Sequence, residues 1–170
     1  MKRFLILFAV VANLVLVDAV TKELAAGCLK GAAAVPVVPG LFDLAYVENR
    51  GCAWGMFQGQ VWPLAAFGIV ALAFLIWKRK SVFGRETGDG RHGLSLMPAI
   101  AEPLLYAGII GNIIDRLFRG YVVDMFDFHW GLHHFPCFNV ADSLICIADG
   151  LMLLSSLGKK KASIGVDKSR

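Results

Sequence analysis

Carboxylate side chains stand at the edges of strongly apolar runs between residues 112 and 143. The acids are Asp115, Asp124 and Asp142, and Asn112 and Asn139 lie close to them in the sequence. Bringing an ionised carboxylate near hydrocarbon costs on the order of 3 kcal/mol, so we expect these acids to serve a function. Two neighbouring carboxylates share a proton, and the ionised one can take a proton from water. The pattern predicts a hydrolytic site at Asp124 and Asp142 that needs no metal and no organic cofactor.

The composition indicates a membrane protein. Of the 170 residues, 57% are hydrophobic and 18% are charged, and the mean hydropathy is +0.63, which is too apolar for an ordinary soluble domain. About 20 apolar residues cross a hydrocarbon core of about 30 Å. The segments that come close to this length are 4–20, 61–77, 94–114 and 140–157. We therefore predict an all-α membrane protein with four transmembrane helices, forming a single integral membrane domain over residues 1–170.

Lysine and arginine residues are distributed unevenly around these segments. Most of them precede the first segment, follow the last one, or lie between the second and the third. By the positive-inside rule, this distribution predicts that both termini are cytoplasmic and that residues 112–143 lie at the outer face. The net charge of +4 is explained by these membrane flanks, so we predict no nucleic-acid partner.

The N-terminal segment has a second interpretation. Lys2, the apolar run after it and an Ala-Ala-Gly-Cys sequence ending at Cys28 are typical of a lipoprotein signal peptide. Asp18 and Lys22 argue against this, because they interrupt the run where a signal peptide is uncharged. We expect the segment to be retained as the first transmembrane helix. The spacing of four places Asp18 and Lys22 on one helix face, either as a helix-end salt bridge or as part of the site.

Further polar residues flank the predicted acids. Asn112, Asp115 and Arg116 have helical spacings that place them on one face, and Arg116 can fork onto a carboxylate, either Asp115 or one across the site. Asn139 is a plausible N-cap of the last helix. Asp142 would then lie in the first turn, where the helix dipole favours a negative charge. This helix-start position is a purely structural alternative to a catalytic role for Asp142.

Two other acids lie within apolar segments. Glu102, next to Pro103, is either a proton-relay acid or a structural residue near the membrane interface, and we favour the structural role. Asp149 lies about two turns beyond Asp142 on the same helix face. There it would be a buried polar partner or line a polar cavity.

The region from residue 30 to 60 forms the longer outer loop. Prolines and glycines break any helix, residues 41–47 alternate as in a strand, and Trp54 with its apolar neighbours suits a membrane interface. The region either covers a site or is a plain loop with an aromatic anchor.

Histidine and cysteine residues leave two questions open. The histidines near Asp127 invite a metal interpretation, but their spacing fits no standard site and we predict no metal. These histidines are His129, His133 and His134. A disulfide is possible among the outer cysteines, but the sequence does not decide the pair. The outer cysteines are Cys28, Cys52 and Cys137.

Taken together, these residues resemble the motifs of the signal peptidase II family, the bacterial membrane aspartyl proteases that process prolipoproteins. The resemblance covers the whole chain, and five motifs in order are far more specific than any one of them. The motifs are Asp18-x-x-Thr21-Lys22, Asn49-x-Gly51-x-Ala53, Gly111-Asn112-x-x-Asp115-Arg116, Val123-Asp124 and Phe138-Asn139-x-Ala141-Asp142-Ser143. Two positions depart from the family pattern, since Trp54 and Met125 stand where the family usually has Phe.

The resemblance implies a function and a site. Asp124 and Asp142 would be the catalytic pair, and a small extracytoplasmic β-cradle would form from residues 35–58. The enzyme would sit in the bacterial inner membrane, in contact with membrane lipid and as a monomer. It would remove the signal peptide from lipidated prolipoproteins by cutting before a diacylglyceryl-modified cysteine. The residues that would line or support the site are Asp18, Lys22, Asn49, Gly51, Asn112, Asp115, Arg116 and Asn139.

Two other functional classes compete with hydrolysis. A small transporter would use Asp18, Asp124, Asp142 and Asp149 as a proton path, and it predicts acids spread through the depth of the bilayer. The acids of this chain gather instead at the outer ends of the predicted helices. A non-catalytic membrane scaffold leaves the clustered Asp, Asn and Arg residues unexplained.

Overall fold

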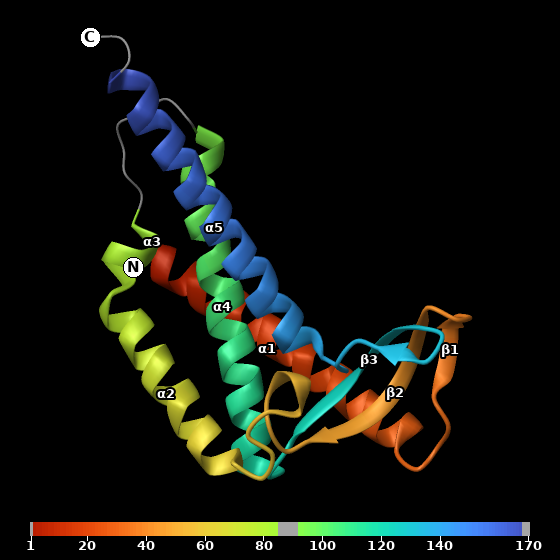
Figure 1. Cartoon of the computed structure of the whole chain (residues 1–170). Coiled ribbons are helices and arrows are strands. Elements are labelled where there is room, and N and C mark those ends of the chain that lie inside the picture. Colours follow the sequence, from red (N-terminus) through yellow and green to blue (C-terminus); the bar gives the residue numbers. More distant parts are fainter. Residues whose placement is uncertain (1, 85–91, 168–170) are drawn as a thin grey trace.

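The computed structural model describes residues 2–84 and 92–167 of the chain. Its helices are α1 (Lys2–Leu29), α2 (Val61–Trp77), α3 (Arg79–Phe83), α4 (His92–Phe118) and α5 (Val140–Asp167). Its strands are β1 (Val35–Val38), β2 (Phe42–Asn49), β3 (Val122–Trp130) and β4 (His133–His134). A 3-10 turn, η1 (Ala53–Gly55), precedes α2. The protein is therefore mostly helical with a small sheet (Figure 1).

In this described part of the chain, three helical stretches are long and apolar enough to cross a membrane. They are Lys2–Leu29, Leu96–Phe118 and Val140–Leu157. The remaining predicted segment forms α2, an apolar helix of 17 residues. α1 and α4 both extend beyond the predicted bounds of 4–20 and 94–114. The charges in α1 do not end the helix, because Lys22 and Asp18 pair at 2.8 Å on one helix face, which confirms the predicted salt bridge.

The strands form one antiparallel sheet in the order β1-β2-β3-β4. In the β2–β3 register, Val47 lies opposite Asp124 and Glu48 lies opposite Val123. The sequence predicted strand structure within residues 35–58 but not in β3 or β4, so the prediction of the sheet was incomplete. β3 pairs with a strand far earlier in the chain. Sequence signals for strand pairing come from short hairpin turns, and a long-range pairing has no such turn.

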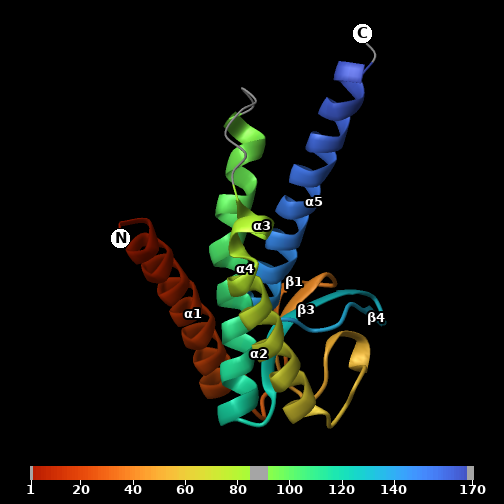
Figure 2. The same cartoon turned by 90° about the vertical axis from the view of Figure 1, so that its left-hand side faces the viewer.

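The sheet lies at one end of the helix bundle (Figures 1 and 2). It packs on the last turns of α1, where Ala25 meets Val123 and Met125 in a small buried core. The first turns of α1 and the last turns of α5 lie away from the sheet (Figure 2). The bundle therefore has two different ends, one covered by the sheet and one formed by helices alone.

α4 is the central helix, because α1, α2 and α5 all pack on it. Gly111 allows two of these helices to approach α4 at the same level. A Cβ atom at this position would lie 2.5 Å from Asp18 Oδ2 and 3.3 Å from the Cβ of Ala141. The first distance is too short for real side chains. A glycine is therefore required here for α1 and α5 to meet on α4.

We predict that Gly111→Ala destabilises the protein by about 1–3 kcal/mol, the usual cost of overpacking a close helix contact. Gly150→Ala in α5 is the matched control, because a Cβ there meets nothing within 4 Å. The control should be neutral or slightly stabilising, since alanine favours helix more than glycine does. Thermal unfolding of the purified variants in detergent measures both effects. Equal unfolding temperatures for the two variants would contradict the packing role of Gly111.

Candidate functional site

Backbone hydrogen bonds hold β3 against the segment that leads into α5. Met125 N donates to Phe138 O at 3.0 Å, and Phe138 N donates to Phe126 O at 3.2 Å. α5 begins two residues after Phe138, at Val140. The chain therefore returns to β3 just before the helix starts, and this brings the first turn of α5 close to Asp124.

The carboxylate of Asp124 is buried under two asparagine amides. Asn139 Nδ2 donates to Asp124 Oδ1 at 2.7 Å, and Asn49 Nδ2 donates to Asp124 Oδ2 at 2.9 Å. The residue is only 1% exposed. Burial, followed by the nearby charge of Asp142, raises the pKa of Asp124 to about 7. Asp124 therefore holds a proton more easily than an ordinary aspartate.

Asp142 lies half-buried in the first turn of α5. Its Oδ1 accepts from Asn112 Nδ2 at 2.7 Å, and its Oδ2 accepts from Asn139 N at 3.3 Å. Asn139 Oδ1 in turn accepts from Asp142 N at 2.9 Å, which confirms Asn139 as the N-cap. The helix-start position proposed as an alternative for Asp142 is therefore correct. It coexists with the electrostatic interaction between Asp142 and Asp124.

Lys22 is a fully buried cation next to this pair of acids. Its Nζ atom lies 2.8 Å from Asp18 Oδ2, 3.1 Å from Asp115 Oδ2 and 3.2 Å from Asn112 Oδ1. An ammonium group has only donors, so it holds the amide oxygen of Asn112 toward itself. The NH₂ group of Asn112 is then directed at Asp142. The contacts of Lys22 are with Asp18, Asp115 and Asn112, and Asn112 in turn contacts Asp142.

Asp18 joins α1 to the start of α5. Its Oδ1 accepts a hydrogen bond from Ala141 N at 2.8 Å, so a carboxylate of α1 satisfies one of the free N–H groups of the α5 N-terminus. Asp115 makes a similar link at the end of α4. It accepts from Val123 N of β3 at 3.1 Å and from Arg119 Nε at 3.0 Å. These acids support the site by fixing the elements that carry it.

The predicted role of Arg116 was partly wrong. Its guanidinium donates to the backbone carbonyls of Gly51 at 3.1 Å and Asn112 at 3.3 Å rather than to a carboxylate. It still interacts electrostatically with both acids of the pair. Gly51 N donates to Asn49 Oδ1 at 2.9 Å, which turns the Asn49 NH₂ group toward Asp124.

All the predicted site residues thus belong to one connected set of hydrogen bonds and ion pairs. The contacts connect α1 to α4, α4 to the start of α5, and α5 to β3. The end of β2 and the residues after it connect β3 back to α4. The members of this set are Asp18, Lys22, Asn49, Gly51, Asn112, Asp115, Arg116, Asp124, Asn139 and Asp142.

The two acids predicted within apolar segments lie outside this set. Glu102 is buried and pairs with Arg79 of α3, which agrees with a structural role. Asp149 is exposed on α5, so its prediction as a buried partner was wrong. The stripe of α5 that packs inward passes through Ala141 and Ala148, and Asp149 lies just beyond it with no sheet to cover it.

The histidines and cysteines form no metal centre within the described ranges. His129 and His134 stack with ring centroids 4.9 Å apart and face Asp43 and Asp127 of the sheet. The four cysteines are free thiols.

A cavity of about 400 Å³ opens beside the pair of acids. Asp142, Asn112 and Arg116 line it, and so do Trp54 and Phe135, whose rings meet edge-to-face at 5.7 Å. A second, apolar cavity of about 940 Å³ lies between α2, α4 and α5 and shares Asn112 and Arg116 with the first. The sequence did not identify the residues after β4 as a wall of the site. The aromatic run Phe135-Pro136-Cys137-Phe138 is the signal that could have shown it.

Comparisons with known proteins agree on one family. The family model described as signal peptidase (SPase) II matches residues 10–158. A lipoprotein signal peptidase of Syntrophotalea carbinolica is 41% identical over 90% of this chain and 91% of its own. A lipoprotein signal peptidase of Clostridium acetobutylicum is 37% identical over 86% of this chain and 88% of its own.

A solved structure described as a bacterial membrane enzyme has a similar fold. It superposes with a TM-score of 0.74 at 30% identity, covering 91% of this chain and 88% of that one. A second one with the same description gives a TM-score of 0.70 at 31% identity.

The raised pKa of Asp124 predicts a pH-dependent stability. The folded protein keeps this proton up to about pH 7, whereas the unfolded chain loses it near 3.8, so unfolding releases a proton between these values. Stability from this group is therefore greatest at low pH and falls as the pH rises toward 7. Asp124→Asn cannot ionise, although it loses one of the two amide donors at every pH. The difference in unfolding free energy between variant and wild type should shift in favour of the variant between pH 4 and pH 8, by a few kcal/mol at most. Thermal unfolding at each pH measures it.

The control for this measurement is Glu23→Gln, which removes a carboxylate that is 69% exposed. The stability difference between this variant and the wild type should change far less over the same pH range. A constant difference for Asp124→Asn from pH 4 to pH 8 would contradict the raised pKa.

Proposed function

The chain belongs to the signal peptidase II family of aspartic peptidases, and from this membership we propose that Asp124 and Asp142 cleave the signal peptide from diacylglyceryl-modified prolipoproteins. The observation that carries this proposal is the pairing of a buried Asp124, with its pKa raised to about 7, and an Asp142 that borders the cavity. Such a pair holds one proton near neutral pH.

We assign the two acids different roles from their surroundings. Asp142 borders the cavity and meets water, so its carboxylate takes a proton from the attacking water molecule. Asp124 gives its proton to the oxygen of the scissile carbonyl as the water oxygen bonds to the carbonyl carbon. Asp142 then passes its proton to the leaving nitrogen while the C–N bond breaks, and a hydroxyl of the intermediate returns a proton to Asp124. The pair ends in its starting state.

The two cavities support a substrate with two apolar parts. They meet at Asn112 and Arg116, so a peptide bond held there would have one apolar volume on each side. We propose that one takes the signal helix and the other the acyl chains of the modified cysteine. Anchoring both parts holds the scissile bond against the acids and makes cleavage nearly intramolecular. One copy of the chain supplies all the proposed site residues, so we propose a monomer in contact with membrane lipid.

We propose a single membrane domain with α2 as the fourth span. At 1.5 Å per residue this helix is about 26 Å long, close to a hydrocarbon thickness of about 30 Å. Trp62 and Trp77, both exposed, lie at its two ends, where tryptophan favours the membrane interface. The basic residues at the sheet-free end favour a cytoplasmic position for that end. The acids and the sheet would then lie at the outer face of the inner membrane.

We expect Asp124→Asn and Asp142→Asn each to lower cleavage of a lipidated prolipoprotein by about a thousandfold or more. Either change removes the shared proton and the water-activating base together, so the double variant should be hardly slower than a single one. Asp127→Asn and Asp149→Asn are the controls and should retain most of the activity. The same assay should show slow cleavage of a prolipoprotein that lacks the diacylglyceryl group. Near-normal turnover by Asp142→Asn would leave this residue with its helix-capping role alone.

Cysteine labelling tests the proposed orientation. In a variant whose native cysteines are replaced by serine, Gly131→Cys at the β3–β4 turn should react with an impermeant maleimide added to intact spheroplasts. Lys80→Cys in α3, equally a surface position, should react only after the membrane is broken. Labelling of the Lys80 position from outside would reverse the orientation and place the acids at the inner face.

A further inference from the structure

A crevice opens between the helices at the end of the bundle away from the sheet. It has a volume of about 220 Å³ and lies between α1 and α2, both of which pack on α4. Its walls are apolar, with two exceptions, Arg79 of α3 and Tyr106 of α4. The apolar residues that line it include Leu7, Phe8, Leu72 and Ile76. None of these residues belongs to the catalytic network.

Arg79 brings a positive charge to this crevice. It forms a two-pronged ion pair with Glu102, whose side chain is 4% exposed, and the Nη2–Oε2 arm of this pair is 3.2 Å long. A guanidinium has more N–H donors than this pair uses. The Arg79 side chain itself is 34% exposed, so part of it is open to a ligand. The ion pair with Glu102 fixes the position of the guanidinium at the crevice.

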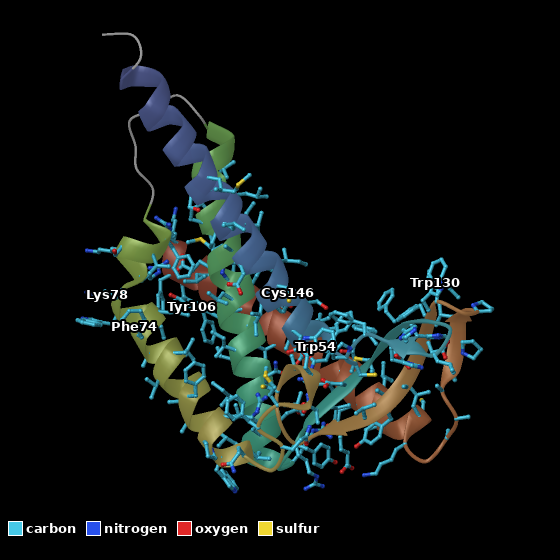
Figure 3. All side chains as sticks on the ribbon, in the orientation of Figure 1. Trp54, Phe74, Lys78, Tyr106, Trp130 and Cys146 are labelled. Carbon is cyan, nitrogen blue, oxygen red and sulfur yellow. The ribbon has the colours of Figure 1, made fainter. Side chains whose placement is uncertain are left out.

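Tyr106 is the second polar group of the crevice. The residue is 6% exposed, and its hydroxyl makes no hydrogen bond of normal geometry to a described residue. Glu102 lies near enough to be a weak acceptor, but its carboxylate already accepts from Arg79. A buried hydroxyl without a partner is costly, so a ligand that accepts its hydrogen bond would be favoured. Figure 3 shows Tyr106 at the level of Lys78 and Phe74, far from Trp54 beside the catalytic cavity.

The surroundings of the crevice are basic. Lys78 and Lys80 flank Arg79, and Lys2 and Arg3 begin the α1 helix whose next turns form one wall. The sequence has no acid in residues 2–17 or 61–84, the segments that supply α1, α2 and α3 here. Glu102 is already paired with Arg79. The crevice is apolar, and its basic residue Arg79 lies between two lysines in the sequence. This combination is complementary to an anionic amphiphile rather than to a water-soluble anion.

We infer that this crevice binds one anionic phospholipid of the bilayer. Its phosphate would accept hydrogen bonds from Arg79 and from the hydroxyl of Tyr106, and part of one acyl chain would lie between α1 and α2. The bound lipid would belong to the leaflet opposite the catalytic acids. It is therefore distinct from the lipid of the proposed substrate, and it would join two helices that both rest on α4.

Native mass spectrometry of the detergent-solubilised full chain tests this site. Phosphatidylglycerol and phosphatidylcholine with identical acyl chains are the probes. Both lipids offer a phosphate to Arg79, but phosphatidylcholine also carries a cationic choline group, which the basic residues around Arg79 disfavour. We therefore expect phosphatidylglycerol, a net anion, to bind about tenfold more tightly. Leu7→Trp fills the crevice and should remove this preference. Leu5→Trp is the matched control, because Leu5 is exposed on the same helix outside the crevice and its substitution should change nothing.

A second set of variants tests the polar contacts. Arg79→Gln combined with Glu102→Gln removes both charges of the buried pair and should abolish the lipid preference, whereas Lys80→Gln should retain most of it. Tyr106→Phe keeps the ring and should weaken phosphatidylglycerol binding several-fold.

Equal binding of the two lipids overturns the proposal. A preference that survives Leu7→Trp, or that falls as much with Lys80→Gln as with the double variant, also overturns it, because it would report a general basic surface. If the double variant does not fold, the comparison of Leu7→Trp with Leu5→Trp decides alone.

Discussion

A buried ammonium group holds together the end of this protein that carries the proposed active site. Lys22 is 1% exposed, and a charge taken out of water is tolerated only where it is fully paired. Its partners come from two helices, Asp18 of α1 with Asn112 and Asp115 of α4. Asp18 then reaches the N-terminus of α5 through Ala141 N, so the three helices that meet at the site are fixed by one charge cluster. Gly111 makes the cluster possible by leaving room for the Asp18 carboxylate.

The same cation fixes the orientation of an amide donor in the site. Because the ammonium only donates, the Asn112 amide cannot turn over without placing its NH₂ group against a positive charge. The NH₂ group is thereby directed at Asp142, and Asn49 and Asn139 direct theirs at Asp124. Neutral amide donors hold the two acids in place without supplying a full positive charge to Asp124. Burial can therefore raise the pKa of Asp124, where a directly bonded arginine would lower it.

The parts of this arrangement that sequence analysis predicted are those set by local spacing. Hydropathy predicted α1, α2, α4 and α5 but not the short α3. The four-residue spacing predicted the Asp18–Lys22 pair, and the residue type of Asn139 before an apolar run predicted the N-cap. The parts it missed depend on long-range pairing. β3 joins β2 although about 75 residues separate them in the sequence, and the partner of Arg116 is a carbonyl of a distant turn. The wrong prediction for Asp149 has a similar cause. Helical periodicity shows which face of α5 a residue lies on, but not whether another element packs against that face.

The proposed position of the acids in the membrane depends on where the candidate spans end. Asp142 is the third residue of the span that begins at Val140, and Asp124 lies in a strand of the sheet beyond it. In the proposed arrangement the pair stands at the limit of the hydrocarbon, where water is available as a reactant. The same position is covered by the sheet, by Asn49 at the end of β2 and by the aromatic contact between Trp54 and Phe135. A site deeper in the bundle would lack water, and one farther out would lose the burial that keeps a proton on Asp124. The junction of sheet and bundle meets both requirements.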